Sequence, residues 1–330
     1  MRASAMIRIV IWTIVALLLV CLLVAGMKGG KSLFIGNIKF PGFSGSYLSY
    51  DDSRYKVVSK AVVETANLDS IEIDWLSGSV EVVMHDGDSV EFEEFSAQEV
   101  LPDHQMRFAV EEGILKIRFA RSGIRLISPL NSFGKTLILR IPRSLALEKL
   151  SVNTVSARVE DTGAGANKYS IKTVSGAVTI SDVDAGNMNL NTTSGRISVS
   201  SASAVTISAG STSGRVDLSG VAAQEIGIDT VSGRIEVGGE FEGLSIGTTS
   251  GSVDVNSREM PQRISISSVS GSITLRLPEN DGFEISYSSI SGSFNCDFDV
   301  KHSNRTATHK GGGSNIRLKT VSGSMRVREW

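Results

Sequence analysis

The sequence predicts an all-β fold, a parallel β-solenoid (β-helix) of about 19 residues per coil that follows one N-terminal transmembrane helix. Three observations lead to this prediction. A motif of the form T-V-S-G-x-V recurs nine times from Thr154 onward. Apolar and polar residues alternate on both sides of each motif, as they do in strands that are buried on one face. An uncharged apolar run of 18 residues, from Ile9 to Gly26, precedes the repeats.

The composition restricts the function before any motif is considered. The 330 residues are 41% hydrophobic and 21% charged, and 33 basic against 35 acidic side chains give a net charge of -2. Because there is no basic excess, the composition gives no case for nucleic acid as a partner. The aliphatic content is too high for a disordered linker. Two cysteines cannot form a disulfide framework, so they do not decide the compartment.

The N-terminal segments are considered first. Residues 1–8 form a short tail, and residues 9–26 would span about 27 Å as a helix, close to the thickness of a bilayer core. We expect a signal anchor, and the alternative is a signal peptide cleaved near the small residues Val24-Ala25-Gly26. A short basic tail before a single anchor usually stays inside the cell. The prediction is therefore a single-pass protein of the cell membrane with its solenoid outside the cytoplasm.

The remaining boundaries follow from pattern. Residues 27–55 are a juxtamembrane spacer rich in Gly, Ser and aromatic residues, which either lies on the bilayer or packs under the first turn of the domain. Residues 56–149 alternate without repeating, so we expect an irregular N-terminal β segment of the solenoid. Residues 150–330 form the regular repeat, with a loop insertion at about 297–314.

The regular repeat can be aligned on the glycine of its motif, taken as position zero. The reference residues are Ala157, Gly176, Gly195, Gly214, Gly233, Gly251, Gly271, Gly292 and Gly323, with spacings of 19, 19, 19, 19, 18, 20, 21 and 31. Positions −7, −5, +2 and +4 are apolar at 35 of 36 places, and the exception is Asp161. Two half-buried strands per repeat, with no room for a helix, are satisfied when coil stacks on coil around one apolar column. Right-handed winding is expected.

The corner at the motif has its own chemistry. Thr or Ser occupies position −3 and Ser occupies position −1 in all nine copies. Both positions share the parity of the inward aliphatic residues, so the sequence predicts buried ladders of hydroxyl groups, in which Ser232 lies between Ser213 and Ser250. The glycine allows the bend through a positive φ or through close approach of neighbouring backbones. Cys296 stands at an inward +4 position and is predicted to be buried.

These features together resemble a known family. The segments that carry the resemblance are LSGSVEV around Gly78, TLILRIP ending at Ile141-Pro142, and LEKLSVNTVSARVE leading into the tandem repeats. They are similar to the bacterial "putative adhesin" family of unknown function, which includes LiaG-like cell-envelope proteins. The resemblance covers about residues 56–330. It implies a membrane-tethered β-solenoid, a link to the cell-envelope stress response, and neither an established activity nor a catalytic motif.

Few residues suggest chemistry. The histidines are His85, His104, His302 and His309. None of them stands at metal-ligand spacing, and HExxH and CxxC motifs are absent. The last two histidines are expected to be solvated in the insertion. We therefore expect no enzyme activity, no metal and no cofactor.

One surface feature is a candidate binding site. Arg196, Arg215 and Arg234 occupy position +1 in successive coils, so they should lie about 4.8 Å apart as a basic stripe. Such a stripe fits an anionic envelope polymer or phospholipid. The alternative is a solvated charge ladder in which the acids at +3, Asp217 and Glu236, offset the arginines and each pair contributes little.

Two functions remain. The leading hypothesis is a membrane-anchored, non-catalytic adhesion or binding module on the cell surface, with an anionic envelope polymer or another envelope protein as its partner. The alternative is a structural scaffold whose open terminal coils associate end to end, as bactofilin-like polymers do. In that case the last strand, with Arg326 and Arg328, would form the contact between copies.

Overall fold

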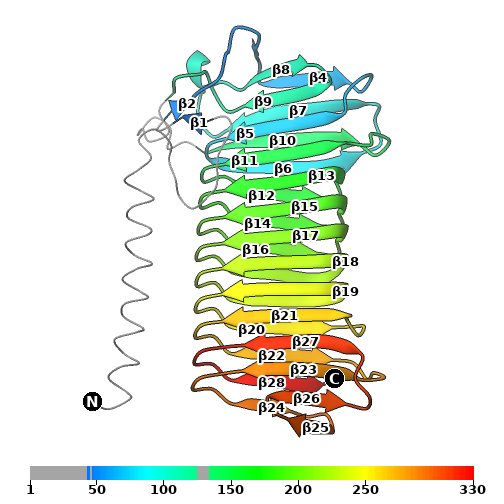
Figure 1. Cartoon of the computed structure of the whole chain (residues 1–330). Helices are drawn as coiled ribbons and strands as arrows, with labels where there is room; N and C mark the ends of the chain where they lie inside the picture. Colours follow the sequence, from blue (N-terminus) through cyan, green and yellow to red (C-terminus); the bar gives the residue numbers. More distant parts are fainter. Residues whose placement is uncertain (1–42, 45–46, 125–133) are drawn as a thin grey trace, which may run out of the picture.

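The computed structural model describes residues 43–44, 47–124 and 134–330 (Figure 1). Over these residues the chain is all-β, with 28 strands and one short 3-10 helix, η1 (Pro102–His104). The predicted tail 1–8, the predicted transmembrane segment 9–26 and most of the predicted spacer 27–55 lie outside them. Within the described part of the chain, no helix is long and apolar enough to cross a membrane.

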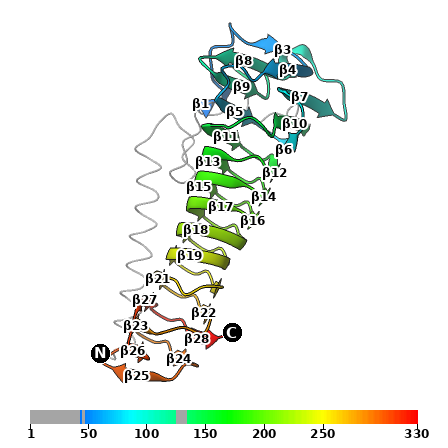
Figure 2. The same ribbon diagram turned by 90° about the vertical axis from the view of Figure 1, so that its right-hand side faces the viewer.

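The strands stack as the rungs of a long rod, which Figures 1 and 2 show from two sides. Each regular coil gives one strand to each of two parallel ladders, and this confirms the predicted all-β fold with a long, mostly parallel sheet. The first ladder runs through β9 (Ile114–Arg118), β5 (Ser70–Trp75), β11 (Lys149–Thr154), β13 (Ala166–Thr173), β15 (Asp184–Thr192), β17 (Ser203–Ser211), the later parts of β18 (Val216–Thr230) and β19 (Ile235–Thr248), β21 (Arg263–Ser268), β27 (Ser314–Lys319) and β23 (Phe283–Ser288). The second ladder runs through β10 (Lys135–Pro142), β6 (Gly78–His85), β12 (Arg158–Thr162), β14 (Val178–Ser181), β16 (Ile197–Ser200), the first parts of β18 and β19, β20 (Val253–Ser257), β22 (Ile273–Leu277), β28 (Met325–Glu329) and β24 (Phe294–Cys296).

Antiparallel strands extend the ladders at both ends of the rod. At the N-terminal end these are β3 (Lys56–Val57), β4 (Lys60–Glu64), β7 (Ser89–Ser96) and β8 (Arg107–Glu111). At the C-terminal end they are β25 (Val300–Ser303) and β26 (Thr306–His309), which form a hairpin within the predicted loop insertion. The strands β1 (Phe43–Ser44) and β2 (Tyr47–Leu48) form a small sheet of their own beside the N-terminal end.

The apolar column runs through the rod as the alternation predicts. In the seven coils aligned on Ala157 through Gly271, every residue at −7, −5, +2 and +4 is buried, with exposed fractions of 3% or less. Asp161, the one polar residue in the set, is also buried, at 1% exposure. Burial of one aliphatic side chain contributes about 1.5–3 kcal/mol. Because every regular coil repeats this burial, the apolar column stabilises the long rod.

The repeat glycines are required because neighbouring backbones approach closely. A Cβ atom on Gly195 would lie 1.9 Å from the carbonyl oxygen of Gly176, and one on Gly214 would lie 1.7 Å from that of Gly195. Neither Gly195 nor Gly214 has a positive φ. Of the two explanations offered by the sequence, close approach is therefore the one that applies.

The two hydroxyl positions of the motif behave differently. The residue at −3 is buried in eight of the nine copies. In seven copies its side-chain oxygen accepts the backbone N–H of the glycine three residues later, as between Thr192 and Gly195 at 2.8 Å. The serine at −1 is exposed, as at Ser232, whose hydroxyl reaches only the Thr212 carbonyl oxygen of the adjacent coil at 3.4 Å. The prediction of a buried ladder through Ser232 is therefore wrong. The strand ends at −3, so its alternation does not extend to −1.

The last coils do not stack in sequence order. β27 and β28 lie between the coil of β21 and β22 and the coil of β23 and β24. After β22 the chain leaves one coil position open, forms β23 and β24, turns through the β25–β26 hairpin, and then fills the open position. The prediction that Arg326 and Arg328 lie on a terminal strand is therefore wrong, because β28 is an interior strand.

The outermost C-terminal coil is only partly covered. The hairpin pairs with β23 and buries Phe283 and Ile285, but β24 pairs with β28 alone. Cys296 on β24 is consequently half-buried, and burial raises the pKa of its thiol. The prediction that Cys296 is fully buried is wrong for this reason. His309 on β26 is buried against Phe283, which corrects the prediction that it is solvated.

Candidate functional site

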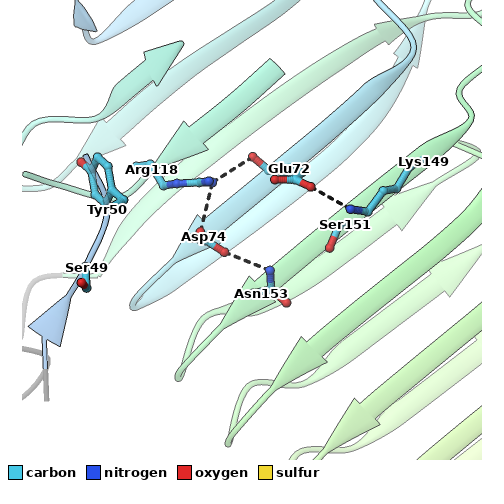
Figure 3. A pocket seen from close by; sticks show the side chains of 8 residues that line it. All are labelled: Ser49, Tyr50, Glu72, Asp74, Arg118, Lys149, Ser151 and Asn153. Atoms are coloured by element: carbon cyan, nitrogen blue, oxygen red, sulfur yellow. Dashed lines mark hydrogen bonds and ion pairs between the residues drawn. The ribbon is translucent and has the colours of Figure 1, made fainter. Parts of the chain in front are cut away.

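A polar pocket opens on the outer face of the first ladder near its N-terminal end (Figure 3). It has a volume of about 120 Å³. The lining residues are Ser49, Tyr50, Glu72, Asp74, Arg118, Lys149, Ser151 and Asn153. The alternation of β9, β5 and β11 turns these side chains outward, and the parallel register sets Asp74 between Arg118 and Asn153. Residues from four separate parts of the sequence meet there.

The charged groups of the pocket are paired with one another. The Nη1 atom of Arg118 lies 3.0 Å from Asp74 Oδ2, and Asn153 donates to Asp74 Oδ1 at 2.9 Å. The Lys149 ammonium lies 2.7 Å from a carboxylate oxygen of Glu72. Burial raises the pKa of Asp74, and the Arg118 charge and the Asn153 hydrogen bond oppose that rise. Two cations and two carboxylates balance, so the pocket has no net charge.

Arg118 is the central side chain of the pocket. Its guanidinium lies 5.9 Å from the ring centroid of Tyr50 and 5.8 Å from that of Tyr55, at the distance of cation–π contacts. Its Nε atom is buried and has no hydrogen-bond acceptor. The contacts of Asp74 with Arg118 and Asn153 connect β9, β5 and β11. The order of these strands in the ladder differs from their order in the chain. Within the described structure no hydroxyl of the pocket forms a hydrogen bond with a carboxylate or with Lys149, and the ion pairs and the Asn153 hydrogen bond join the three strands.

A second charged cluster is buried at the same end of the rod. The Lys135 ammonium donates to Glu94 Oε2 at 2.6 Å and to the carbonyl oxygens of His104 and Phe119 at 2.6 and 2.5 Å. Burial lowers the pKa of Lys135 to about 8 and raises the pKa of Glu94. All three ammonium protons have acceptors. The cluster therefore joins β7, β10 and the segment around η1, and its lysine is not available to a substrate.

The predicted basic stripe forms as a structure but carries little free charge. Arg196, Arg215 and Arg234 lie in successive coils, linked by backbone hydrogen bonds of the adjacent residues. Arg215 pairs with Asp217 at 3.2 Å and also with Glu236. Arg234 pairs with Glu236 at 2.7 Å and with Asp254 at 3.0 Å. Two of the three arginines are thus held by acids, in the arrangement of the charge-ladder alternative.

A shallow groove of about 320 Å³ runs beside the stripe. Its lining includes Asp217, Arg234, Gly238, Asp254 and Arg276. The absent side chain of Gly238 leaves the space, since a Cβ there would have no atom closer than 3.9 Å. Acids and arginines alternate along the groove, which again leaves little net charge.

Among the described residues, no group of three or more His, Cys, Asp or Glu side chains could hold a metal ion. Among the described residues that follow Arg263 in the sequence, no lysine or arginine forms an ion pair with an acid.

Comparisons with known proteins agree with the fold. Residues 68–328 match the sequence profile of the family described as Toastrack DUF4097. Comparison with curated proteins gives no match. A solved "putative adhesin" from Parabacteroides distasonis is similar with 15% identity and a TM-score of 0.50, covering 84% of this chain and 98% of that one. Another from Parabacteroides merdae has 12% identity and a TM-score of 0.48, with 84% and 97% covered.

Proposed function

The chain belongs to the Toastrack DUF4097 family, and we propose that it acts as a non-catalytic binding module of the bacterial cell envelope. In this proposal residues 9–26 anchor the chain in the cell membrane, and the rod stands outside the cytoplasm. The family resemblance adds a role in the response to envelope stress. The partner is an anionic envelope polymer or another envelope protein.

One observation carries the proposal: the rod has a continuous apolar core, and the polar pocket and the groove described above are lined mostly by charges that pair with each other. The groove, of about 320 Å³, holds Arg234 paired with Glu236 and Asp254, and Arg276 bonded to Asn256. The polar pocket, of about 120 Å³, is lined by cations and carboxylates in ion pairs. An elongated body of this kind offers surface to a partner along its outer face. The apolar run from Ile9 to Gly26 supports the anchored position.

The scaffold alternative has one observation in its favour. β24 pairs with β28 on one side only, so its other edge is free, and Phe294 on this strand is half-buried. A free strand edge with apolar side chains is a site where a second strand can add. Contact between two copies would then join C-terminal ends and give pairs of rods.

Labelling of intact cells tests the proposed position. The full chain would carry Cys21→Ser and Cys296→Ser together with one new cysteine in place of the exposed Ser175. A membrane-impermeant maleimide should label this variant in intact cells as fully as in lysed cells. A matched variant with a cysteine in place of the buried Leu190 should stay unlabelled in both. Labelling of Ser175→Cys only after lysis would place the rod inside the cell and overturn the proposal.

A further inference from the structure

The groove beside the stripe has a floor of peptide backbone. The side chains of Leu218 and Val237 are buried in the core, so their main-chain atoms form the floor of the groove that they line. Gly238 leaves this floor open, because a Cβ atom there would have no neighbour closer than 3.9 Å. The lining comes from β18, β19, β20 and β22, which are four successive strands of the second ladder, so the groove extends about 14 Å along the rod. Its volume of about 320 Å³ lies within the range of small-molecule sites.

The walls of the groove offer hydrogen-bond acceptors and donors in similar numbers. The acceptors are the carboxylates of Asp217, Glu236 and Asp254. The main donors are the guanidinium groups of Arg234 and Arg276. Three negative charges against two positive charges give an anion no net attraction to the groove. The lining instead suits a ligand whose groups both donate and accept hydrogen bonds without carrying charge.

The contacts within the groove hold its side chains in place and leave part of their hydrogen-bonding capacity free. Arg276 donates to the amide oxygen of Asn256 at 3.0 Å, and this contact orients both side chains. Within the described structure, the amide nitrogen of Asn256 and the hydroxyl of Ser219 have no hydrogen-bond partner. Asp254 accepts from Arg234 at 3.0 Å, and a carboxylate can accept further hydrogen bonds. A ligand can therefore bind without breaking the existing pairs.

An exposed tryptophan ring lies beside this groove. Trp330 directly follows β28 and is 67% exposed. Its indole N–H donates to the carbonyl oxygen of Ser257 at 3.1 Å. Ser257 ends β20 next to Asn256 of the groove, and β22 lies between β20 and β28. The indole therefore crosses the end of β22 near Arg276, and the hydrogen bond fixes it there.

We propose that the groove and the ring of Trp330 bind an uncharged β-1,4-linked oligosaccharide. The hydroxyl groups of a sugar ring both donate and accept hydrogen bonds, as the walls of the groove require. The C–H groups on the face of the ring pack on an indole, whose face is electron-rich. In β-1,4-linked sugars the chain is extended, so it can follow a groove that runs along the rod. The inference goes beyond the proposed function, because it concerns a ligand without charge and does not depend on where the rod stands.

The groove suits a sugar better than a peptide. In the second ladder β19 pairs with both β18 and β20, and β20 pairs with both β19 and β22. These strands therefore have no free edge to which a peptide could add as a further strand. The aliphatic residues of the lining, Leu218 and Val237, are buried in the core, so the groove gives an apolar peptide side chain no pocket.

The test uses variants of the full chain in nanodiscs of phosphatidylcholine. Gly238→Leu fills the groove, and the strand can accept it because the glycine has no positive φ and a Cβ atom there meets nothing closer than 3.9 Å. Gly227→Leu is the matched control, since it adds the same side chain to the outer face of the first ladder, where a Cβ atom meets nothing within 4 Å. Trp330→Ala removes the ring, and Trp330→Phe keeps an aromatic face. Thermal melting by circular dichroism shows that each variant folds.

The probes are tetrasaccharides of β-1,4-linked glucose, N-acetylglucosamine and mannose, titrated by isothermal calorimetry. We expect the unmodified chain to bind at least one of them, and Gly238→Leu and Trp330→Ala to lose about tenfold in affinity or more. Trp330→Phe should lose less than Trp330→Ala, and Gly227→Leu should bind nearly as the unmodified chain does. The affinity should hardly change between low and high salt, because the ligand carries no charge.

Three results would overturn the inference. Absence of binding to all three tetrasaccharides would show that the groove has no such ligand. Undiminished binding by Gly238→Leu, or an equal loss in Gly227→Leu, would show that the sugar does not occupy the groove. Displacement of the bound sugar by inorganic polyphosphate, with a steep dependence on salt, would identify an anion as the ligand of the groove. The titration does not depend on topology, so it can fail while the labelling of intact cells succeeds, and the reverse.

Discussion

The carboxylate of Asp161 accepts a 2.7 Å hydrogen bond from the hydroxyl of Tyr169 inside the apolar column of the rod. It also accepts the backbone N–H of Ala164 at 2.9 Å. The register partners of Asp161 are Val82 and Ile180, both apolar, and no described cation pairs with the carboxylate. Burial raises the pKa of Asp161 to about 7. A carboxyl group that is easily charged in the unfolded chain is therefore hard to charge in the folded one.

This relationship predicts a pH-dependent stability. Because the folded pKa lies above the unfolded value, the folded state binds the proton more tightly. The unfolding free energy should thus be highest below about pH 4 as far as this group is concerned, and should fall as the pH rises to about 7, by up to about 4 kcal/mol. Asp161→Asn should remove this dependence and raise the melting temperature at pH 8. Denaturant unfolding between pH 4 and 8 measures it.

The half-buried acid Asp217, on the outer face, provides the control for this prediction. Asp217→Asn removes the same charge on the outer face and should leave the pH profile unchanged. If Asp161→Asn and the unmodified chain show parallel profiles, the carboxylate is not buried uncharged at neutral pH.

The sequence was sufficient for the core because its alternation is local. Ile171 and Val178 are inward because each stands at a fixed distance from the same glycine, and every regular coil repeats the pattern. The same alternation predicted the burial of Cys296 wrongly. Its exposure depends on which coil is outermost, and that order arises from contacts between residues far apart in the chain.

The candidate sites also differed in how far the sequence alone could predict them. The stripe could be located because Arg215 and Arg234 are equivalent in the repeat, but Glu236 lies close enough to pair with both. The polar pocket could not, because Arg118 and Asn153 meet only through the register of β5.

The close approach of glycines predicts an asymmetric response to one added methyl group. Gly214→Ala places a Cβ atom 1.7 Å from the carbonyl oxygen of Gly195, so the two coils must separate. We expect a loss of at least about 3 kcal/mol in the unfolding free energy, above the usual range for overpacked side chains. Gly227→Ala is the matched control, since a Cβ there meets nothing within 4 Å. It should change stability by less than about 0.5 kcal/mol. Similar urea midpoints for the two variants would contradict the close contact.

The buried hydroxyl at position −3 should contribute more to the unfolding free energy than the exposed hydroxyl at position −1. Thr192→Val keeps the shape of the side chain but leaves the Gly195 N–H without its acceptor. The expected loss is about 1–3 kcal/mol, the penalty for an unsatisfied buried donor. Ser194→Ala, two residues later at the exposed position, should change stability by less than about 0.5 kcal/mol. Thermal unfolding of the two single variants compares them, and a larger effect at Ser194 would refute this account of the corner.

The buried pair of Lys135 and Glu94 should be far more sensitive than the exposed pairs. Their side chains are only 2% and 3% exposed, so Lys135→Met leaves a carboxylate in the interior without its cation. Such a change is expected to cost about 3–5 kcal/mol. Adding Glu94→Gln should recover part of the loss, because the amide oxygen can still accept the Met106 N–H, which lies 2.8 Å from Glu94. Recovery should stay incomplete, since the carbonyl oxygens of His104 and Phe119 still lack a donor.

The exposed pair of Lys168 and Glu148 is the control for the Lys135 prediction. Their side chains are 65% and 49% exposed and 2.8 Å apart, and Lys168→Met should leave the urea midpoint nearly unchanged because solvent screens the pair. Urea unfolding of Lys135→Met, of the double variant and of Lys168→Met separates the contributions. A double variant no more stable than Lys135→Met alone would show that the loss comes from the carbonyl oxygens and the ring contacts of the ammonium. The charge of Glu94 would then have little part in holding the N-terminal end of the rod together.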